Sequence, residues 1–290
     1  MTTTTLNPPT GRSTLPFVDA CHPERPLTVN CYRPERHRPN DPVVVVQHGM
    51  MRNGDDYRDF WIDAAEKHNL LIVAPTFPDA AFPKAEGYNN GFVVAADGTI
   101  TPREQWLYAV PARVIQALRA ASVIEQPTIR IFGHSAGGQF VHRMLATFGM
   151  GPFGEAIAAN AGWYTLPTLE RRFAEGLGGL GIEEEAVVRW LALPMVLLAG
   201  DRDIATDDAN LPSNPEALAQ GPHRFGRAYF MLQAGQTEAK ARGTPCNWQL
   251  VPVAGIGHDG AAMSRAAAAF WFEGRVPSAT ELGPSRKQVG

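Results

Sequence analysis

The chain has 290 residues, of which 44% are hydrophobic, so it can bury a large core in one large α/β domain or two small ones. Its formal net charge is −3, and its Lys and Arg residues form no cluster beyond short patches, which excludes an extended nucleic-acid-binding surface. No apolar stretch approaches the length of a membrane-spanning helix, and the first residues lack the regions of a secretory signal. The sequence therefore predicts a cytoplasmic protein without nucleic-acid or membrane partners, or a secreted one if a leader has been removed. It does not indicate the oligomeric state.

The three cysteines, Cys21, Cys31 and Cys246, include no C-x-x-C pair, so a structural zinc site is not expected. An odd number of cysteines without a secretory signal favours free thiols. A disulfide between Cys21 and Cys31 stays open as an alternative.

Residues 1–25 are rich in Thr, Pro and Arg, which predicts an extended N-terminal arm. Apolar runs and helical patterns then alternate along the chain. Strands are predicted at residues 27–32, 43–46, 70–73, 128–132, 156–159, 195–198 and 249–253. Helices are predicted at residues 57–65, 106–118, 138–145, 183–191, 223–241 and 261–272.

This alternation predicts an α/β fold, with a mostly parallel sheet and helices on both faces. The run of four valines at 43–46 is typical of a strand buried on both faces, whereas the alternating strand at 27–32 suits an antiparallel edge. A single domain over 26–275 with a C-terminal tail over 276–290 is the best interpretation.

Two segments fit the alternation poorly. Residues 76–102 contain a candidate hairpin, and residues 204–247 contain Pro-rich turns and a helix. Each is either a cap or insert above a site, or surface decoration.

The stretch Gly133-His134-Ser135-Ala136-Gly137 matches the pattern G-x-S-x-G between a predicted strand and a predicted helix. A strand that turns sharply into a helix lifts one side chain above the end of a sheet, and glycine is needed where the neighbouring chain leaves no room for a Cβ. The helix N-terminus then faces the point at which negative charge develops. The pattern predicts Ser135 as a nucleophile.

Loops after two later strands supply a base and an acid. Asp201 and Asp203 follow one strand, and His258 follows the last. A serine hydroxyl needs a base within hydrogen-bond reach, and that base needs an orienting carboxylate. We prefer Asp203 because a loop must run a few residues past its strand before it turns back toward the histidine. Asp201 stays the alternative, with pairing to Arg202 or capping as its expected role.

The loop Gln47-His48-Gly49-Met50 follows the predicted strand at 43–46. Its glycine lets the backbone run close to the serine, so the N–H groups of Met50 and Ala136 are the predicted oxyanion hole, with Met51 as the alternative donor. His134 and His142 are expected to have structural roles, and Asp259 is expected to cap the last helix.

These motifs together resemble the α/β-hydrolase superfamily over about residues 27–272. The resemblance rests on Val43–Met50, Gly133–Gly137, Gly200–Asp203 and Gly257-His258. Within the superfamily, Gln47–Tyr57 and Ala65–Pro75 resemble the poly(3-hydroxybutyrate) depolymerase/feruloyl esterase group, especially its LpqC-like members.

The resemblance implies an α/β-hydrolase fold and a serine esterase that cleaves carboxylic esters through Ser135, His258 and Asp203 with an acyl-enzyme intermediate. The expected partner is a small-molecule or oligomeric ester, of hydroxyalkanoate or aryl (feruloyl-type) character. Trp163 and Tyr164 follow the predicted strand at 156–159, and they either line an acyl or aryl pocket or pack the loop itself. No metal or organic cofactor is implied, because the triad supplies the nucleophile, the base and its orienting acid.

Two other functions remain open at this point. A peptidase, thioesterase or amidase would use the same residues on the same fold. A non-catalytic binding module is the alternative from another class, but such modules usually lack one member of the triad.

Overall fold

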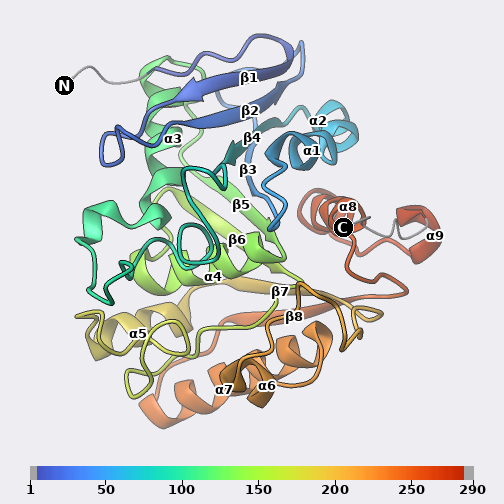
Figure 1. Cartoon of the computed structure of the whole chain (residues 1–290). Helices are drawn as coiled ribbons and strands as arrows, with labels where there is room; N and C mark the ends of the chain where they lie inside the picture. Colours follow the sequence, from blue (N-terminus) through green and yellow to red (C-terminus); the bar gives the residue numbers. More distant parts are fainter. Residues whose placement is uncertain (1–4, 284–290) are drawn as a thin grey trace.

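An eight-stranded sheet runs through the centre of the computed structural model, which describes residues 5–283 (Figure 1). The strands are β1 (Gly11–Phe17), β2 (Leu27–Arg33), β3 (Val43–Gln47), β4 (Leu71–Thr76), β5 (Ile129–His134), β6 (Phe153–Ala159), β7 (Met195–Gly200) and β8 (Trp248–Val253). Their order in the sheet is β1-β2-β4-β3-β5-β6-β7-β8, and β4, β3 and β5 to β8 are parallel. The predicted mostly parallel sheet is confirmed.

Helices cover both faces of this sheet (Figure 1). The helices are α1 (Gly54–Asp59), α2 (Ile62–His68), α3 (Val110–Ala120), α4 (Ala136–Phe148), α5 (Glu184–Ala192), α6 (Pro215–Ala219), α7 (Arg224–Arg242), α8 (Gly260–Glu273) and α9 (Ala279–Leu282), with 3-10 turns η1 (Arg103–Gln105) and η2 (Leu107–Ala109). One apolar cluster packs α1, α2 and α8 on one face, and the other packs α3, α4, α5 and α7 on the opposite face. Every residue of β3 is buried, as its run of valines predicts for a strand covered on both faces.

The predicted N-terminal arm contains an additional strand. β1 pairs antiparallel with β2, so β1 is the edge of the sheet, and β2 lies between it and β4 instead of at the edge. Side chains of β1 alternate between exposed and half-buried, as in a strand with one solvated face. Its polar residues and Pro16 weaken the strand signal in the sequence, and an edge strand tolerates both.

The single helix predicted at 57–65 is two helices, α1 and α2, which are separated at Phe60 and Trp61. Trp61 is fully buried and packs against Phe132 of β5 and Trp271 of α8. The break between the two helices therefore coincides with a large side chain that is buried in the core.

The two irregular segments agree with the expectations in part. The candidate hairpin in residues 76–102 is short: an antiparallel bridge joins Val94 and Ile100, and backbone hydrogen bonds run from Ala95 to Thr99 and from Thr101 to Val93. In residues 204–247, the predicted helix is α7, which packs on β7 and β8 as a layer of the fold, and the stretch before it is a loop with the short helix α6. The predicted tail contains α9, and its residues 284–290 lie outside the described part.

Within residues 5–283, no helix is both long enough and apolar enough to cross a membrane, and no cluster of His, Cys, Asp or Glu could hold a metal ion. Cys21, Cys31 and Cys246 are free thiols, so the alternative disulfide between the first two is not formed. Burial raises the pKa of the Cys31 thiol to about 12, which keeps it protonated and unreactive at neutral pH.

The turn from β5 into α4 holds Ser135 in a strained conformation, with φ 58° and ψ −116°. A Cβ at Gly133 would lie 2.1 Å from the Gly137 carbonyl oxygen, and one at Gly137 would lie 2.2 Å from that of Gln47. Both glycines are therefore required by backbone contacts that fix the turn against the end of β3.

We expect Gly137→Ala to destabilise the protein by about 3 kcal/mol or more, because its Cβ would meet backbone atoms that cannot move aside. Chemical denaturation measures the effect. Gly226→Ala is the matched control, since its Cβ would meet only the His223 ring, at 3.2 Å, and alanine favours the α7 helix. Equal unfolding midpoints for the two variants would contradict this account of the turn.

Two buried histidines bond to the backbone of neighbouring loops, one from the loop after β3 and one from α4. The His48 ring bonds to the Gly49 carbonyl through Nδ1 at 2.8 Å and accepts from the Phe77 N–H through Nε2 at 3.1 Å. His142 bonds to the Gly138 carbonyl and the Thr165 N–H in the same way, both at 3.0 Å. Because a carbonyl only accepts and an N–H only donates, each ring is held neutral with its proton on Nδ1.

Burial lowers the pKa of His48 to about 3, and burial together with the Arg143 charge lowers that of His142 well below its usual value. Between the lowered folded pKa and the unfolded value of about 6.5, the unfolded chain binds more protons, so stability decreases as pH decreases. Through this linkage, each histidine lowers the free energy of unfolding by about 1.4 kcal/mol as the pH decreases from 7.5 to 5.5.

We expect His142→Gln to be less stable at pH 7.5 but to lose about 1.4 kcal/mol less than wild type on acidification to pH 5.5. Denaturant unfolding at both pH values gives the difference. A variant that keeps the full wild-type loss would show that His142 does not stay neutral in the folded protein.

Candidate active site

Three loops at the carboxyl edge of the sheet bring Ser135, Asp203 and His258 into one chain of hydrogen bonds. His258 Nε2 lies 3.0 Å from Ser135 Oγ, and its Nδ1 lies 2.7 Å from Asp203 Oδ2. The Asp203 side chain is 2% exposed and that of His258 is 18% exposed, while Ser135 is half-buried. The arrangement has the geometry of a nucleophile, a base and an orienting acid.

The two neighbouring acids have other partners. Asp201 Oδ1 accepts the Gly255 N–H at 2.7 Å, so it fastens the β8 loop, and no ion pair with Arg202 is found in the described residues. Asp259 accepts the N–H groups of Ala261 and Ala262, which confirms the predicted cap of α8. The acid in contact with the histidine is therefore Asp203.

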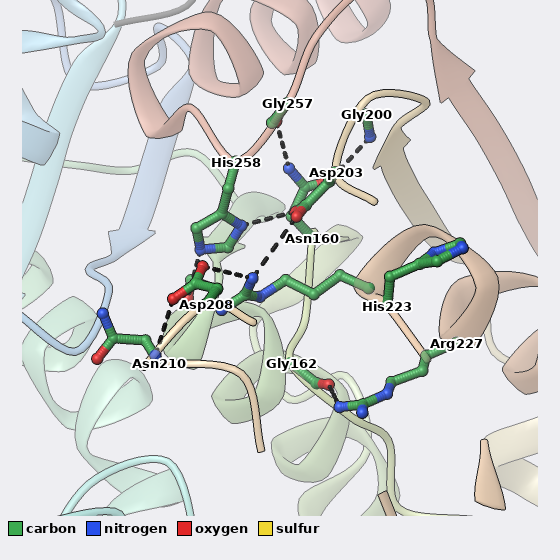
Figure 2. A network of polar contacts seen from close by, with 12 residues as sticks. Asn160, Gly162, Gly200, Asp203, Asp208, Asn210, His223, Arg227, Gly257 and His258 are labelled. Carbon is green, nitrogen blue, oxygen red and sulfur yellow. Dashed lines mark hydrogen bonds and ion pairs between the residues drawn. The ribbon is translucent and has the colours of Figure 1, made fainter. Parts of the chain in front are cut away.

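Asn160, at the end of β6, connects the acid loop to the histidine loop. Its Oδ1 accepts the Gly200 N–H at 2.8 Å, and its Nδ2 donates to the Gly257 carbonyl at 3.0 Å. Figure 2 shows Asn160 between these two glycines, beside Asp203 and His258. It holds the end of β7 against the residue that precedes His258.

Arg224, at the start of α7, adds a buried positive charge next to the acid. Its Nη1 lies 2.8 Å from Asp208 Oδ2 and 3.6 Å from Asp203 Oδ1, and its side chain is 1% exposed. Burial opposes the charge of Asp208, but the Asn210 N–H, Arg224 and His258 outweigh it and lower the pKa of its carboxyl. Asp208 is therefore a second carboxylate on this network (Figure 2).

His134 packs beneath the candidate base instead of contacting Ser135. Its ring centroid lies 4.7 Å from that of His258, and its Nδ1 lies 2.7 Å from the Tyr57 hydroxyl. Burial and the nearby His258 and Arg224 lower the pKa of His134 well below its usual value. It is thus an uncharged support, as the sequence predicted.

The loop after β3 passes close to the serine. A Cβ at Gly49 would lie 3.8 Å from the Ser135 Cβ, and the preceding His48 is held by the Tyr88 hydroxyl, which donates to its carbonyl at 2.7 Å. Within residues 5–283, the N–H groups of Met50 and Ala136 donate to no protein acceptor. Both remain available to a ligand oxygen.

The two candidate pocket residues have different surroundings. Trp163 is half-buried, with the Arg143 guanidinium 5.3 Å from its ring centroid. Tyr164 is fully buried, its N–H and carbonyl bond to the Gln220 amide, and its ring packs on His142. The expectation that Tyr164 lines the pocket is therefore corrected, because it offers no surface to a substrate.

Sequence reasoning missed Arg224, Asp208 and the role of Asn160. Arg224 lies 21 positions after Asp203 at the start of a helix, and no local pattern connects them. Asn160 has a detectable signal, because an asparagine directly after a buried strand, here with φ 43°, is typical of a special turn.

Comparison with solved structures identifies close relatives. LpqC, a poly(3-hydroxybutyrate) depolymerase from Bordetella parapertussis, is 54% identical with a TM-score of 0.91, covering 94% of each chain. Poly(aspartic acid) hydrolase-1 from Sphingomonas sp. KT-1 is 33% identical with a TM-score of 0.86, covering 89% of this chain and 97% of that one.

An S-formylglutathione hydrolase from Agrobacterium tumefaciens shares only the fold, at 17% identity and a TM-score of 0.57 over 93% of this chain and 98% of that one. A scan of family models and a search of curated proteins each gave no match. The fold and the identity to LpqC, 54% over nearly the whole chain, show that the chain belongs to the α/β-hydrolase superfamily and, within it, to the LpqC-like group of carboxylic ester hydrolases.

Proposed function

We propose that the protein is a serine esterase in which Ser135 is the nucleophile, His258 the general base and Asp203 the orienting acid. The observation that carries the proposal is the hydrogen-bonded chain of these three side chains, at 3.0 and 2.7 Å. A serine hydroxyl is a poor nucleophile by itself, and this contact gives its proton an acceptor.

In the proposed reaction, Ser135 Oγ attacks the ester carbonyl while its proton passes to His258 Nε2. His258 then protonates the leaving alcohol, and an acyl-enzyme remains on Ser135. A water molecule that gives its proton to His258 releases the acid in the second half. Asp203 stays ionised and holds the imidazole with its Nδ1 proton toward the carboxylate.

The oxyanion of each tetrahedral intermediate would accept hydrogen bonds from the N–H groups of Met50 and Ala136. Ala136 opens α4, whose dipole also favours negative charge at this end. The nearness of the Gly49 backbone to Ser135 supports Met50 as the second donor.

We propose a hydroxyalkanoate or aryl ester as the substrate class, with Trp163 as one wall of the acyl or aryl pocket. The hydroxyalkanoate assignment is supported by the 54% identity to a poly(3-hydroxybutyrate) depolymerase. The second candidate is an amide, because the 33% identical relative is described as a poly(aspartic acid) hydrolase.

Ser135→Ala should lower the rate of p-nitrophenyl butyrate hydrolysis by about 10⁴-fold or more, because no other group can form the acyl-enzyme. Labelling by a fluorophosphonate probe should be lost in parallel. Ser264→Ala is the matched control, since Ser264 is a buried serine of α8 without a hydrogen-bond partner among the described residues. Wild-type turnover in Ser135→Ala would refute the assignment.

Asp203→Asn should lower kcat by about 10³–10⁴-fold, because the amide favours the wrong tautomer of His258. Asp201→Asn should keep kcat within a few-fold, since the Asp201 carboxylate bonds, among residues 5–283, only to the Gly255 N–H. The reverse result would assign the role of orienting acid to Asp201.

A substrate panel separates the ester classes from the amide. Short 3-hydroxybutyrate oligomers, methyl ferulate and aspartate oligomers should be given to wild type and Ser135→Ala, with kcat/KM compared among the three substrates. We expect the hydroxybutyrate oligomers to be preferred, and a higher kcat/KM for aspartate oligomers would instead assign amide hydrolysis.

A further inference from the structure

Two carboxylates and one guanidinium surround the candidate base, although a simple triad needs only one acid. Asp203 contacts His258 directly, and Arg224 reaches both Asp203 and Asp208 through Nη1. The shorter contact of Arg224, 2.8 Å, goes to Asp208, and the longer one, 3.6 Å, goes to Asp203. The guanidinium is thus held mainly by the acid that does not touch the base.

We infer that Arg224 and Asp208 form a compensated ion pair that positions Asp203 and leaves a single net negative charge facing His258. The inference rests on the serine esterase function proposed above. Arg224 alone would neutralise Asp203 and withdraw it from the imidazole. Asp208 alone would add a second negative charge beside the imidazole.

The charges of Arg224 and Asp203 interact strongly because both side chains are buried. The side chains of Arg224 and Asp203 are 1% and 2% exposed, so water screens their charges poorly. The Nε and Nη2 atoms of Arg224 have no hydrogen-bond partner in the described part of the chain, so the carboxylates are its main polar contacts.

Of the other titratable groups near His258, His134 and Tyr164 are uncharged, and Asp259 directs its carboxylate to the N-terminus of α8. His134 of β5, together with the Tyr57 hydroxyl of α1, packs below the ring, and burial keeps His134 neutral. Burial and the Asp203 charge raise the pKa of Tyr164, so this side chain is neutral too. Asp259, next in the chain, is held by N–H groups at the start of α8.

The inference predicts opposite changes in the pH profile of kcat/KM. Arg224→Gln removes a positive charge, and this removal stabilises the imidazolium of His258. The acid limb of the profile, where kcat/KM falls as the pH decreases, should therefore move to a higher pH by about half a unit to one unit. Asp208→Asn removes a negative charge, so His258 loses its proton more easily and the limb should move down by a similar amount. The double variant should lie within about 0.3 unit of wild type, since a cancelled pair is removed.

Matched controls separate this effect from a loss of packing or of overall charge. Asp207→Asn removes the same charge one residue away, at an exposed position, and should leave the limb in place. Arg227→Gln removes the next buried arginine of α7, which bonds to the carbonyls of Gly221 and Gly162. It should change stability without moving the limb.

Arg224→Lys keeps the charge and should restore most of the wild-type profile, with lower kcat because one ammonium cannot match the guanidinium geometry. If Arg224→Gln does not fold, Arg224→Lys and Asp208→Asn alone still test the inference. Shifts of the same sign, or no shift in Asp208→Asn, would overturn it. That result would leave the proposed function intact as long as Ser135→Ala remains inactive.

Discussion

The close contact between the serine turn and the end of β3 is the constraint on which the site depends. Ser135 has a φ of 58°, which costs about 1–3 kcal/mol and persists only where surrounding structure imposes it. The contact of Gly137 with the Gln47 carbonyl imposes it. Because the chain after Gln47 continues directly into the loop with Met50, one contact fixes both the nucleophile and its proposed oxyanion donor.

The other half of the site depends on the ends of β6, β7 and β8. Asn160, directly after β6, bonds to Gly200 at the end of β7 and to the residue before His258, so its side chain sets the separation of the two loops. The Arg202 N–H also donates to the Ile256 carbonyl at 2.9 Å. These contacts thus place the proposed acid and base, and the inferred Arg224–Asp208 pair adjusts the proton affinity of His258.

The sequence predicted the parts of this molecule that have local signals. The valine run of β3, the glycines around Ser135 and the order of Asp203 and His258 each belong to a short motif, which is why the sheet core and the proposed triad were predictable. The strand β1 was missed because its polar edge sequence matches that of an extended arm. The contact of Arg224 with the acid, and the burial of Tyr164, depend on distant segments packing together, which no window of sequence contains.

A buried arginine links the loop after β3 to residues 76–102. Arg52, in the loop after β3, donates to the carbonyls of Phe77, Phe82 and Lys84 at 2.7–3.2 Å, and its guanidinium lies 4.4 Å from the Tyr88 ring centroid. Residues 76–102 are therefore fastened to the loop that carries the proposed oxyanion donor. A change in residues 76–102 that disturbs these contacts would then reach the neighbouring Met50 through Arg52, so this segment is mechanically coupled to the proposed oxyanion donor.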